Sequence, residues 1–243
     1  MKRIKITNNS PAVLGFSLAC FAVLVVNTFT GGAANRLLFM TYHSSLKNPL
    51  TYLRFFTHVL GHENWTHFIG NISYLLLLGP TLEEKYGAKK LIEVIGVTAL
   101  VTGLVNYFLF PNVALCGASG VVFAFILLVS FTNVRGGEIP VTVILVALIF
   151  LGQQIYEAVF LRDNVSNLSH ILGGIVGATA GYKLNLRRNN SHFPIISLRW
   201  FRKHALYGSQ LLIISFPRKE CKEMGCLTKG RYLVRRNYIF QYI

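Results

Sequence analysis

The chain has 243 residues, of which 53% are hydrophobic and only 14% are charged, with a formal net charge of +15 and a mean hydropathy of +0.49. This composition is too apolar and too poor in charge for a soluble domain of this size. It predicts an integral membrane protein with little room for soluble structure.

Six apolar runs have the roughly 17–25 residues that a bilayer-spanning helix requires. They are Pro11–Phe29, Thr66–Leu82, Leu91–Phe110, Leu115–Thr132, Ile139–Phe160 and Val165–Tyr182. The first run follows Lys2, Arg3 and Lys5, as in a signal peptide, but it is long and no A-x-A-like cleavage site stands out at Asn27–Gly32. We therefore expect an all-α polytopic protein: a cytoplasmic segment 1–10, a six-helix membrane domain 11–184 and a basic cytoplasmic tail 185–243.

The orientation follows from Lys and Arg near the ends of the runs. The N-terminus, the Lys85–Lys90 turn, Arg135 and the Lys183–Arg188 end alternate with poorer segments, although the first outer loop carries three basic residues, Arg36, Lys47 and Arg54. Both termini are predicted to be cytoplasmic. The short N-terminus shows no recognisable organelle-targeting segment, which favours a prokaryotic inner membrane.

Much of the positive charge lies after Leu184, where only Glu220 and Glu223 oppose a set of basic residues. These are Arg187, Arg188, Arg199, Arg202, Lys203, Arg218, Lys219, Lys222, Lys229, Arg231, Arg235 and Arg236. A basic segment just cytoplasmic of a membrane helix most simply binds anionic lipid headgroups, at about 1 kcal/mol per charge near the surface. Nucleic acid is the alternative partner, but no recognisable binding motif supports it, so none is expected.

The loop Ala33–Trp65 is too polar and irregular to cross a bilayer, yet it is rich in aromatic residues. Aromatic side chains favour the membrane interface, so we expect this first loop to lie in the outer leaflet. Its end carries His58, His62, Glu63 and Asn64, which make the outer mouth of the bundle polar enough for water to enter.

His67 and Asn71 open the second run and lie four residues apart, so they share one face of a helix. Neighbouring histidines can bind zinc, and a metal site is the obvious alternative. However, there is no H-E-x-x-H element, the nearest carboxylate is Glu63, and asparagine is a poor ligand. We expect neither a metal nor a cofactor.

A serine opens the fourth run, in Gly117-Ala118-Ser119-Gly120, and His170 opens the sixth. An imidazole in hydrocarbon is costly unless it has a partner or faces water, so it indicates a functional site. The second, fourth and sixth runs all enter from the outer side. His67, Asn71, Ser119 and His170 are therefore predicted to converge on one layer just below the outer surface.

Small residues predict how two of these helices pack. Gly173 and Gly177 lie on the same face as His170, and this small-xxx-small spacing lets membrane helices approach closely. Gly120 and Ala124 can offer the matching surface on the fourth run. This packing would bring His170 within hydrogen-bond reach of the serine.

The chemistry that such a layer supports is acyl transfer. A serine hydroxyl becomes a nucleophile when an imidazole accepts its proton, and the same imidazole can protonate the leaving amine. No acidic residue is placed to complete a triad, because Asp163 lies beyond the helix start, so Ser119 and His170 form a dyad. Asn71, His67 and the backbone N–H of Ser119 are the candidate oxyanion donors.

These residues resemble the rhomboid family of intramembrane serine proteases over Leu53–Tyr182. The resemblance is carried by Leu53-Arg54-Phe55-Phe56-Thr57-His58, by the H-x-x-x-x-H-x-x-x-N element of His62, His67 and Asn71, by Gly117–Gly120, and by His170, Gly173 and Gly177.

The resemblance implies a six-helix rhomboid-like bundle and a serine endopeptidase. Ser119 would be the nucleophile and His170 the general base, while His67 and Asn71 would stabilise the oxyanion. Glu83 matches a structural acidic position. The implied substrate is a transmembrane helix that unwinds near the outer face and is cut beside a small residue.

The chain departs from the family at two positions, and two other functions stay open. Leu53 stands where many bacterial members have tryptophan, and Phe123 where a tyrosine commonly stacks on the histidine; phenylalanine keeps the ring, so activity is expected to survive. A rhomboid-like binder of membrane helices without proteolysis is the main alternative, opposed by the intact serine and histidine. A transporter or channel is disfavoured, because paired charges are nearly absent inside the runs, apart from Glu157 and the Gln153–Gln154 pair near the outer end of the fifth run.

Overall fold

The structure, a computed structural model of the chain, describes residues 8–132, 139–160, 164–191, 212–214, 232–235 and 238–241. The chain divides into two units, Met1–Ser191 and His192–Ile243. Several residues used above for orientation or for the dyad argument lie outside the described ranges: Lys2, Arg3, Lys5, Arg135, Asp163 and most of the basic residues of the tail.

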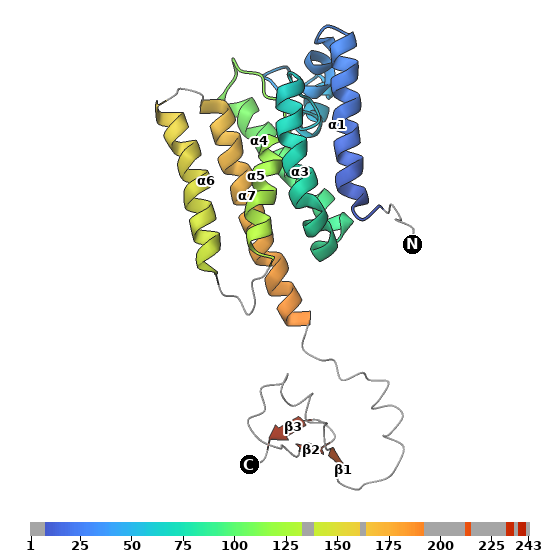
Figure 1. Cartoon of the computed structure of the whole chain (residues 1–243), viewed down its shortest axis with the longest axis vertical. Coiled ribbons are helices and arrows are strands. Elements are labelled where there is room, and N and C mark those ends of the chain that lie inside the picture. Colours follow the sequence, from blue (N-terminus) through green and yellow to red (C-terminus); the bar gives the residue numbers. More distant parts are fainter. Residues whose placement is uncertain are drawn as a thin grey trace, which may run out of the picture. The chain divides into compact units, whose positions relative to one another are not determined.

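Helices make up the regular structure of the first unit. They are α1 (Pro11–Phe29), the π-helical segment η1 (Asn35–Phe39), α2 (Pro49–Thr57), α3 (Trp65–Tyr86), α4 (Ala88–Leu109), α5 (Ser119–Ser130), α6 (Val141–Phe160) and α7 (Asn164–Ser191). A helix is confirmed at each of the six predicted runs. The helices α3, α5 and α7 run in the same direction, downward in Figure 1.

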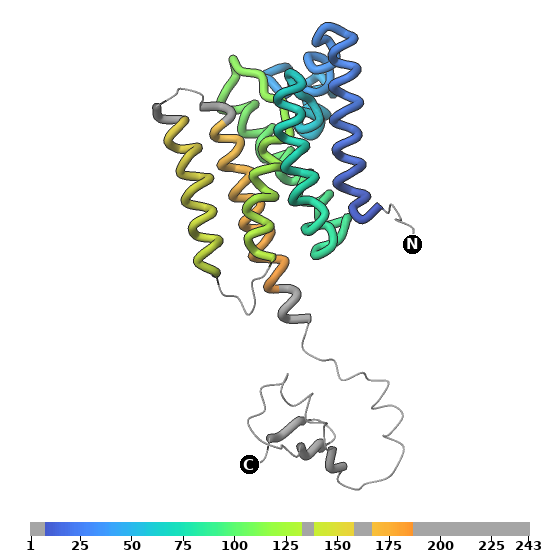
Figure 2. Tube along the Cα trace, viewed as in Figure 1, coloured from blue at the N-terminus to red at the C-terminus, as the bar shows by residue number. Residues whose placement is uncertain are grey.

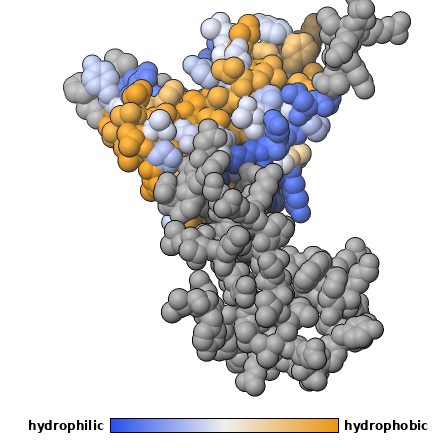
Figure 3. Space-filling model, turned by 60° about the horizontal axis from the view of Figure 1, so that its bottom comes forward, coloured by the Kyte–Doolittle hydropathy of each residue, from blue (hydrophilic) through white to orange (hydrophobic). Residues whose placement is uncertain are grey.

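Membrane-spanning character differs among these helices. Within the described residues, α1 and α4 are long and apolar enough to cross a bilayer by composition alone, and α5 and residues 141–157 of α6 are shorter apolar helices. Figure 3 shows hydrophobic residues over much of the visible face of the bundle and hydrophilic residues gathered at the end turned toward the viewer. These features are those of an integral membrane protein.

The sequence prediction missed one helix and misplaced two element boundaries. The first loop contains α2, a helix that was not predicted. The helix α5 begins at Ser119 rather than Leu115, because Gly117 has φ +130° and breaks the helical path. At its other end, α7 continues to Ser191 instead of stopping at Tyr182.

The helix α5 occupies the centre of the bundle and contacts α3, α4, α6 and α7. On one side α1 packs against α3 and α4, while α6 lies at the opposite edge and packs on α7 and α5 (Figures 1 and 2). Most residues of α5 are buried, including Val121, Phe125 and Leu128. A central helix that is apolar all round is expected to be enclosed by others.

A carboxylate from α3 caps the start of α1. Ser10 precedes the helix, but its side chain accepts no capping hydrogen bond. Instead, Glu83 accepts hydrogen bonds from the backbone N–H groups of Ala12 and Val13, at 2.9 and 3.0 Å. A carboxylate at a helix N-terminus accepts hydrogen bonds from unpaired N–H groups and interacts favourably with the positive end of the helix dipole. This contact gives Glu83 the structural role that the family resemblance implied.

The second unit contains a small antiparallel sheet in the order β1-β2-β3. Its strands are β1 (Leu212–Ile214), β2 (Tyr232–Arg235) and β3 (Tyr238–Gln241). The register pairs Ile213 with Leu233, and Leu233 with Phe240. The sequence did not predict these strands. The all-α expectation therefore holds for the first unit but not for the second.

Candidate active site

An extended segment holds the residues that lead into α5. Thr41 and Leu115 exchange two backbone hydrogen bonds of 2.9 Å, which tie the segment to the first loop. The amide of Asn106 on α4 donates to the carbonyls of Thr41 and Val113, at 3.2 and 3.1 Å. The serine motif is therefore anchored from both α4 and the first loop.

Gly117 is a position that only glycine can occupy. Its φ of +130° is unfavourable for any residue with a side chain. A Cβ there would also lie 2.6 Å from Cε1 and 2.8 Å from Nε2 of His67, and 3.8 Å from Nδ2 of Asn71. The structure thus brings the first turn of α3 directly against the loop that precedes Ser119.

The first turn of α3 is fixed by its own cap. Asn64 accepts a hydrogen bond of 2.9 Å from the backbone N–H of His67. One turn later, Asn71 is buried, with 8% of its surface exposed. Its Nδ2 has no hydrogen-bond partner among the described residues. Buried donors are almost always paired, so an unpaired amide beside the serine loop is a donor available to a ligand oxygen.

His62 supports His67 from behind. The two imidazole rings meet edge to face, with centroids 5.2 Å apart, and His62 meets Phe68 in the same way at 5.4 Å. His62 is fully buried, and its carbonyl accepts a hydrogen bond of 2.9 Å from the amide of Asn35. Burial first, and then the nearby His67, lowers the pKa of His62 to about 4, so this support is uncharged at neutral pH.

His58 joins the first loop to the serine motif. Its carbonyl accepts the backbone N–H of Gly117 at 2.9 Å. Its ring is buried, with Nδ1 3.1 Å from the carbonyl of Arg54 and Nε2 3.1 Å from the hydroxyl of Thr102. Burial lowers the pKa of His58 to about 4, so this imidazole is also neutral.

The helices α5 and α7 touch through their backbones at the predicted glycines. A Cβ at Gly173 would lie 2.0 Å from the carbonyl oxygen of Gly120, and one at Gly177 would lie 2.0 Å from that of Ala124. Such close approach requires small residues on both helices. The face of α7 that carries His170 is therefore the face that meets the start of α5.

The ring of Phe123 fixes the orientation of the His170 imidazole. The two rings are parallel, with centroids 4.4 Å apart and an interplanar angle of 5°. Phe123 lies four residues after Ser119, so both are on the same face of α5. Ser119 and His170 are each partly exposed.

A glutamine from α6 also reaches the histidine. Oε1 of Gln154 lies 2.5 Å from Nδ1 of His170, and Gln154 is buried, with only 4% of its surface exposed. Sequence reasoning missed this residue, treating it only as an exception to the apolar run. Its signal was a polar side chain inside a membrane helix, which by itself indicates a partner.

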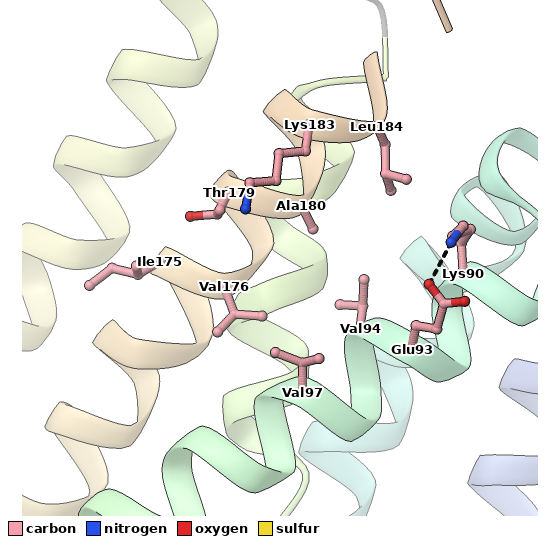
Figure 4. Close-up of a pocket in the computed structure, with 10 residues that line it drawn as sticks. All are labelled: Lys90, Glu93, Val94, Val97, Ile175, Val176, Thr179, Ala180, Lys183 and Leu184. Carbon is pink, nitrogen blue, oxygen red and sulfur yellow. Dashed lines mark hydrogen bonds and ion pairs between the residues drawn. The ribbon is translucent and has the colours of Figure 1, made fainter. Parts of the chain in front are cut away.

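Other binding features lie apart from this layer. Among the described residues, no group of three or more His, Cys, Asp and Glu side chains is arranged to hold a metal ion. A cavity of about 320 Å³ lies between α4 and α7 (Figure 4). It is lined largely by apolar residues, with Lys183 and the Lys90–Glu93 ion pair among them, and none of the predicted site residues borders it.

Comparison with known proteins identifies the family of the chain. Residues 49–187 match the family model of the Rhomboid domain. The chain is similar to the rhomboid protease GlpG of Salmonella paratyphi A (strain ATCC 9150 / SARB42), with 29% identity over 144 residues. This alignment covers 56% of the chain and about half the length of the relative, 50%. With more than half of its length matched by the family model, the chain belongs to the rhomboid family.

Proposed function

We propose that this protein is an intramembrane serine endopeptidase that hydrolyses peptide bonds in or near transmembrane helices of other proteins. The observation that carries the proposal is the parallel stack of His170 on Phe123, one helical turn from Ser119. The similarity to a rhomboid protease supports the same reaction.

The proposed reaction begins with the serine. Ser119 Oγ attacks the substrate carbonyl carbon as its proton passes to Nε2 of His170. The tetrahedral intermediate then collapses, and the imidazolium gives the proton to the leaving amine nitrogen. Water, deprotonated by the same imidazole, hydrolyses the resulting acyl-enzyme and restores the serine.

Three donors are proposed to stabilise the oxyanion. The unpaired Nδ2 of Asn71 and the ring of His67 lie against the serine loop. The backbone N–H of Ser119 belongs to the first turn of α5, where N–H groups have no partner within the helix and the helix dipole favours negative charge. One such donor is worth about a 100- to 1,000-fold rate increase.

The length of α5 supports a site below the membrane surface. With 12 residues it is about 18 Å long, against a hydrocarbon core of about 30 Å. If its C-terminal end is at the cytoplasmic face, as the basic segments favour, Ser119 lies within the outer half of the bilayer. We propose six spanning helices, cytoplasmic termini, an interfacial first loop and a site open to the outer side of a prokaryotic inner membrane.

The proposed substrate is a helix that unwinds near the outer face and offers a small residue at the cut. Gly117 and Gly120 are buried, Gly117 against His67 and Gly120 against Thr102 and Ser169, so their lack of side chains lets these neighbours pack close to Ser119. Anionic lipids remain proposed partners of residues 185–243, and no nucleic acid is proposed.

The test uses the purified chain in proteoliposomes with a single-span substrate and a fluorophosphonate probe. Cleavage and labelling are expected for the wild type and for Ser130→Ala, a matched serine at the other end of α5, and both are expected to vanish in Ser119→Ala. A wild type that binds helix-destabilised substrates but neither cleaves nor labels would instead make the protein a non-proteolytic binder of membrane helices.

A further inference from the structure

We propose that Gln154 is a positioning residue that holds His170 in the tautomer a general base requires, and that α6 thereby controls the alignment of the dyad. This inference rests on the proposed function, because it concerns how the base of that reaction is oriented. It adds a third group to what the sequence alone presents as a two-residue dyad.

The hydrogen bond between the two side chains selects the tautomer. An amide oxygen can only accept, so Oε1 of Gln154, 2.5 Å from Nδ1 of His170, requires the ring hydrogen to be on Nδ1. The lone pair is then on Nε2, the nitrogen that takes the serine proton in the proposed reaction. With the amide turned over, its NH₂ would donate to Nδ1, and the hydrogen would sit on Nε2, where it blocks proton transfer.

A second residue of α6 supports the same ring indirectly. Phe150 precedes Gln154 by one helical turn and lies on the same face. Its ring meets Phe123 edge to face, with centroids 6.0 Å apart, and Phe123 is the ring that stacks on His170. The imidazole is thus held on its face by α5 and at its Nδ1 edge by α6.

The helix α6 is little enclosed by the rest of the bundle. It packs on α7 and α5 at the edge of the structure (Figure 1). Its outward residues are widely exposed, with Leu148 at 65% and Ile149 at 63%, while Val143 and Gln154 are its buried residues among those whose side chains are described. A helix with few buried contacts shifts at low cost. Moving α6 away from α7 would break the hydrogen bond and leave the base unoriented.

The chain offers a matched control for this contact. Gln153 is adjacent on α6 but exposed, and its amide donates to Glu157 at 2.9 Å. Gln154→Leu removes the acceptor at similar size, Gln154→Glu keeps an acceptor, and Gln153→Leu changes the neighbouring glutamine only. Thermal unfolding of each variant shows whether it has folded. Gln154→Met replaces Gln154→Leu if the latter does not fold.

Two readouts test the proposal. The first is the rate at which the fluorophosphonate probe labels Ser119. We expect Gln154→Leu to be slowed about 10- to 100-fold, less than the roughly 10⁴-fold loss when an orienting partner imposes the wrong tautomer. Gln154→Glu should recover most of the rate, and Gln153→Leu should match the wild type. Equal labelling of Gln154→Leu and wild type, or no recovery in a folded Gln154→Glu, would overturn the proposal.

The second readout does not depend on activity. Nitrogen NMR of histidine-labelled protein, at about pH 8 where an ordinary imidazole is neutral, identifies the tautomer of His170 by comparison with His170→Ala. A hydrogen on Nδ1 in the wild type and a mixed population in Gln154→Leu are expected, whereas a hydrogen on Nε2 in the wild type rejects the inference. A protein with the expected tautomer that is never labelled would refute the proposed function instead.

Discussion

The imidazole of His170 lies parallel to the phenyl ring of Phe123, 4.4 Å away between centroids. The two residues come from α7 and α5, the helices whose backbones touch at Gly120–Gly173 and Ala124–Gly177. Backbone contact fixes the helix pair, and ring stacking fixes the histidine on it. The position of the proposed base therefore depends on packing that has no chemical role of its own.

Replacing Phe123 tests the stack. Phe123→Leu should slow substrate cleavage about 2- to 10-fold, because an aromatic pair contributes about 0.5–1.5 kcal/mol beyond its buried area. Phe123→Tyr keeps the ring and should cleave at a rate close to wild type. Cleavage is measured in proteoliposomes at saturating substrate, and a Phe123→Leu protein as fast as Phe123→Tyr would show that the stack does not position the base.

Enlarging Gly173 tests the helix contact. Gly173→Ala places a methyl group 2.0 Å from the carbonyl oxygen of Gly120, so α5 and α7 must move apart. We expect a loss of about 1–3 kcal/mol in the free energy of unfolding, as for overpacked cores, together with slower probe labelling. Gly152→Ala on α6 is the control, since nothing lies within 4 Å of its Cβ; equal thermal stability of the two variants would contradict the tight contact.

Much of this site follows from the sequence, because spacing along a helix determines which residues share a face. The Gly173 and Gly177 surface and its match on α5 were predictable on that ground. The contact of Gln154 was not, because it depends on how α6 is rotated against α7, and periodicity in an apolar run does not record this. The start of α5 was missed because the sequence does not show which glycine has a positive φ, and Gly117 looks the same as glycines that serve only helix packing.

The first loop and the tail were missed for a different reason. The sequence of α2 carries a proline at its start and aromatic residues throughout, a composition shared by irregular interfacial segments and short helices. Its buried Arg54 donates to the carbonyl of Leu37 and lies 4.5 Å from the Tyr42 ring, contacts made only in the folded loop. The strand β1 pairs with β2 from about 20 residues away, which local propensity does not encode, whereas β2 and β3 form a local hairpin.

Removing the carboxylate of Glu83 should destabilise α1. Glu83→Gln keeps the size but removes the charge that caps Ala12 and Val13. The free energy of unfolding should fall by about 0.5–2 kcal/mol, as for other lost N-terminal caps. Glu84→Gln, at the exposed neighbouring position, should leave it unchanged. Chemical unfolding in mild detergent measures both variants, and a similar loss in each would mean that general charge is responsible.

Stability should fall with acid because of two buried histidines in the first loop. The pKa of His58 and that of His62 are each lowered to about 4 by burial, below the ordinary 6.5. Between these values the unfolded chain binds more protons than the folded one, so the stabilisation is present above pH 6.5 and is lost as the pH falls toward 4. The slope is at most about 1.4 kcal/mol per pH unit for each histidine. Thermal unfolding across this range should show a shallower slope in His58→Gln, and an unchanged slope would exclude His58 as a source.

Replacing Asn71 should lower the rate of catalysis while leaving the stability of the protein nearly unchanged. Its Nδ2 is buried without a partner among the described residues, so Asn71→Ala removes an unsatisfied donor and should cost little stability. As a proposed oxyanion donor, its loss should lower kcat about 100- to 1,000-fold with little change in KM. Asn106→Ala is the opposite case: its amide holds the carbonyls of Thr41 and Val113, so that variant should lose thermal stability through two broken hydrogen bonds. Cleavage kinetics and unfolding measured on both proteins decide the assignment, and an Asn71→Ala enzyme that keeps its kcat would remove Asn71 from the oxyanion site.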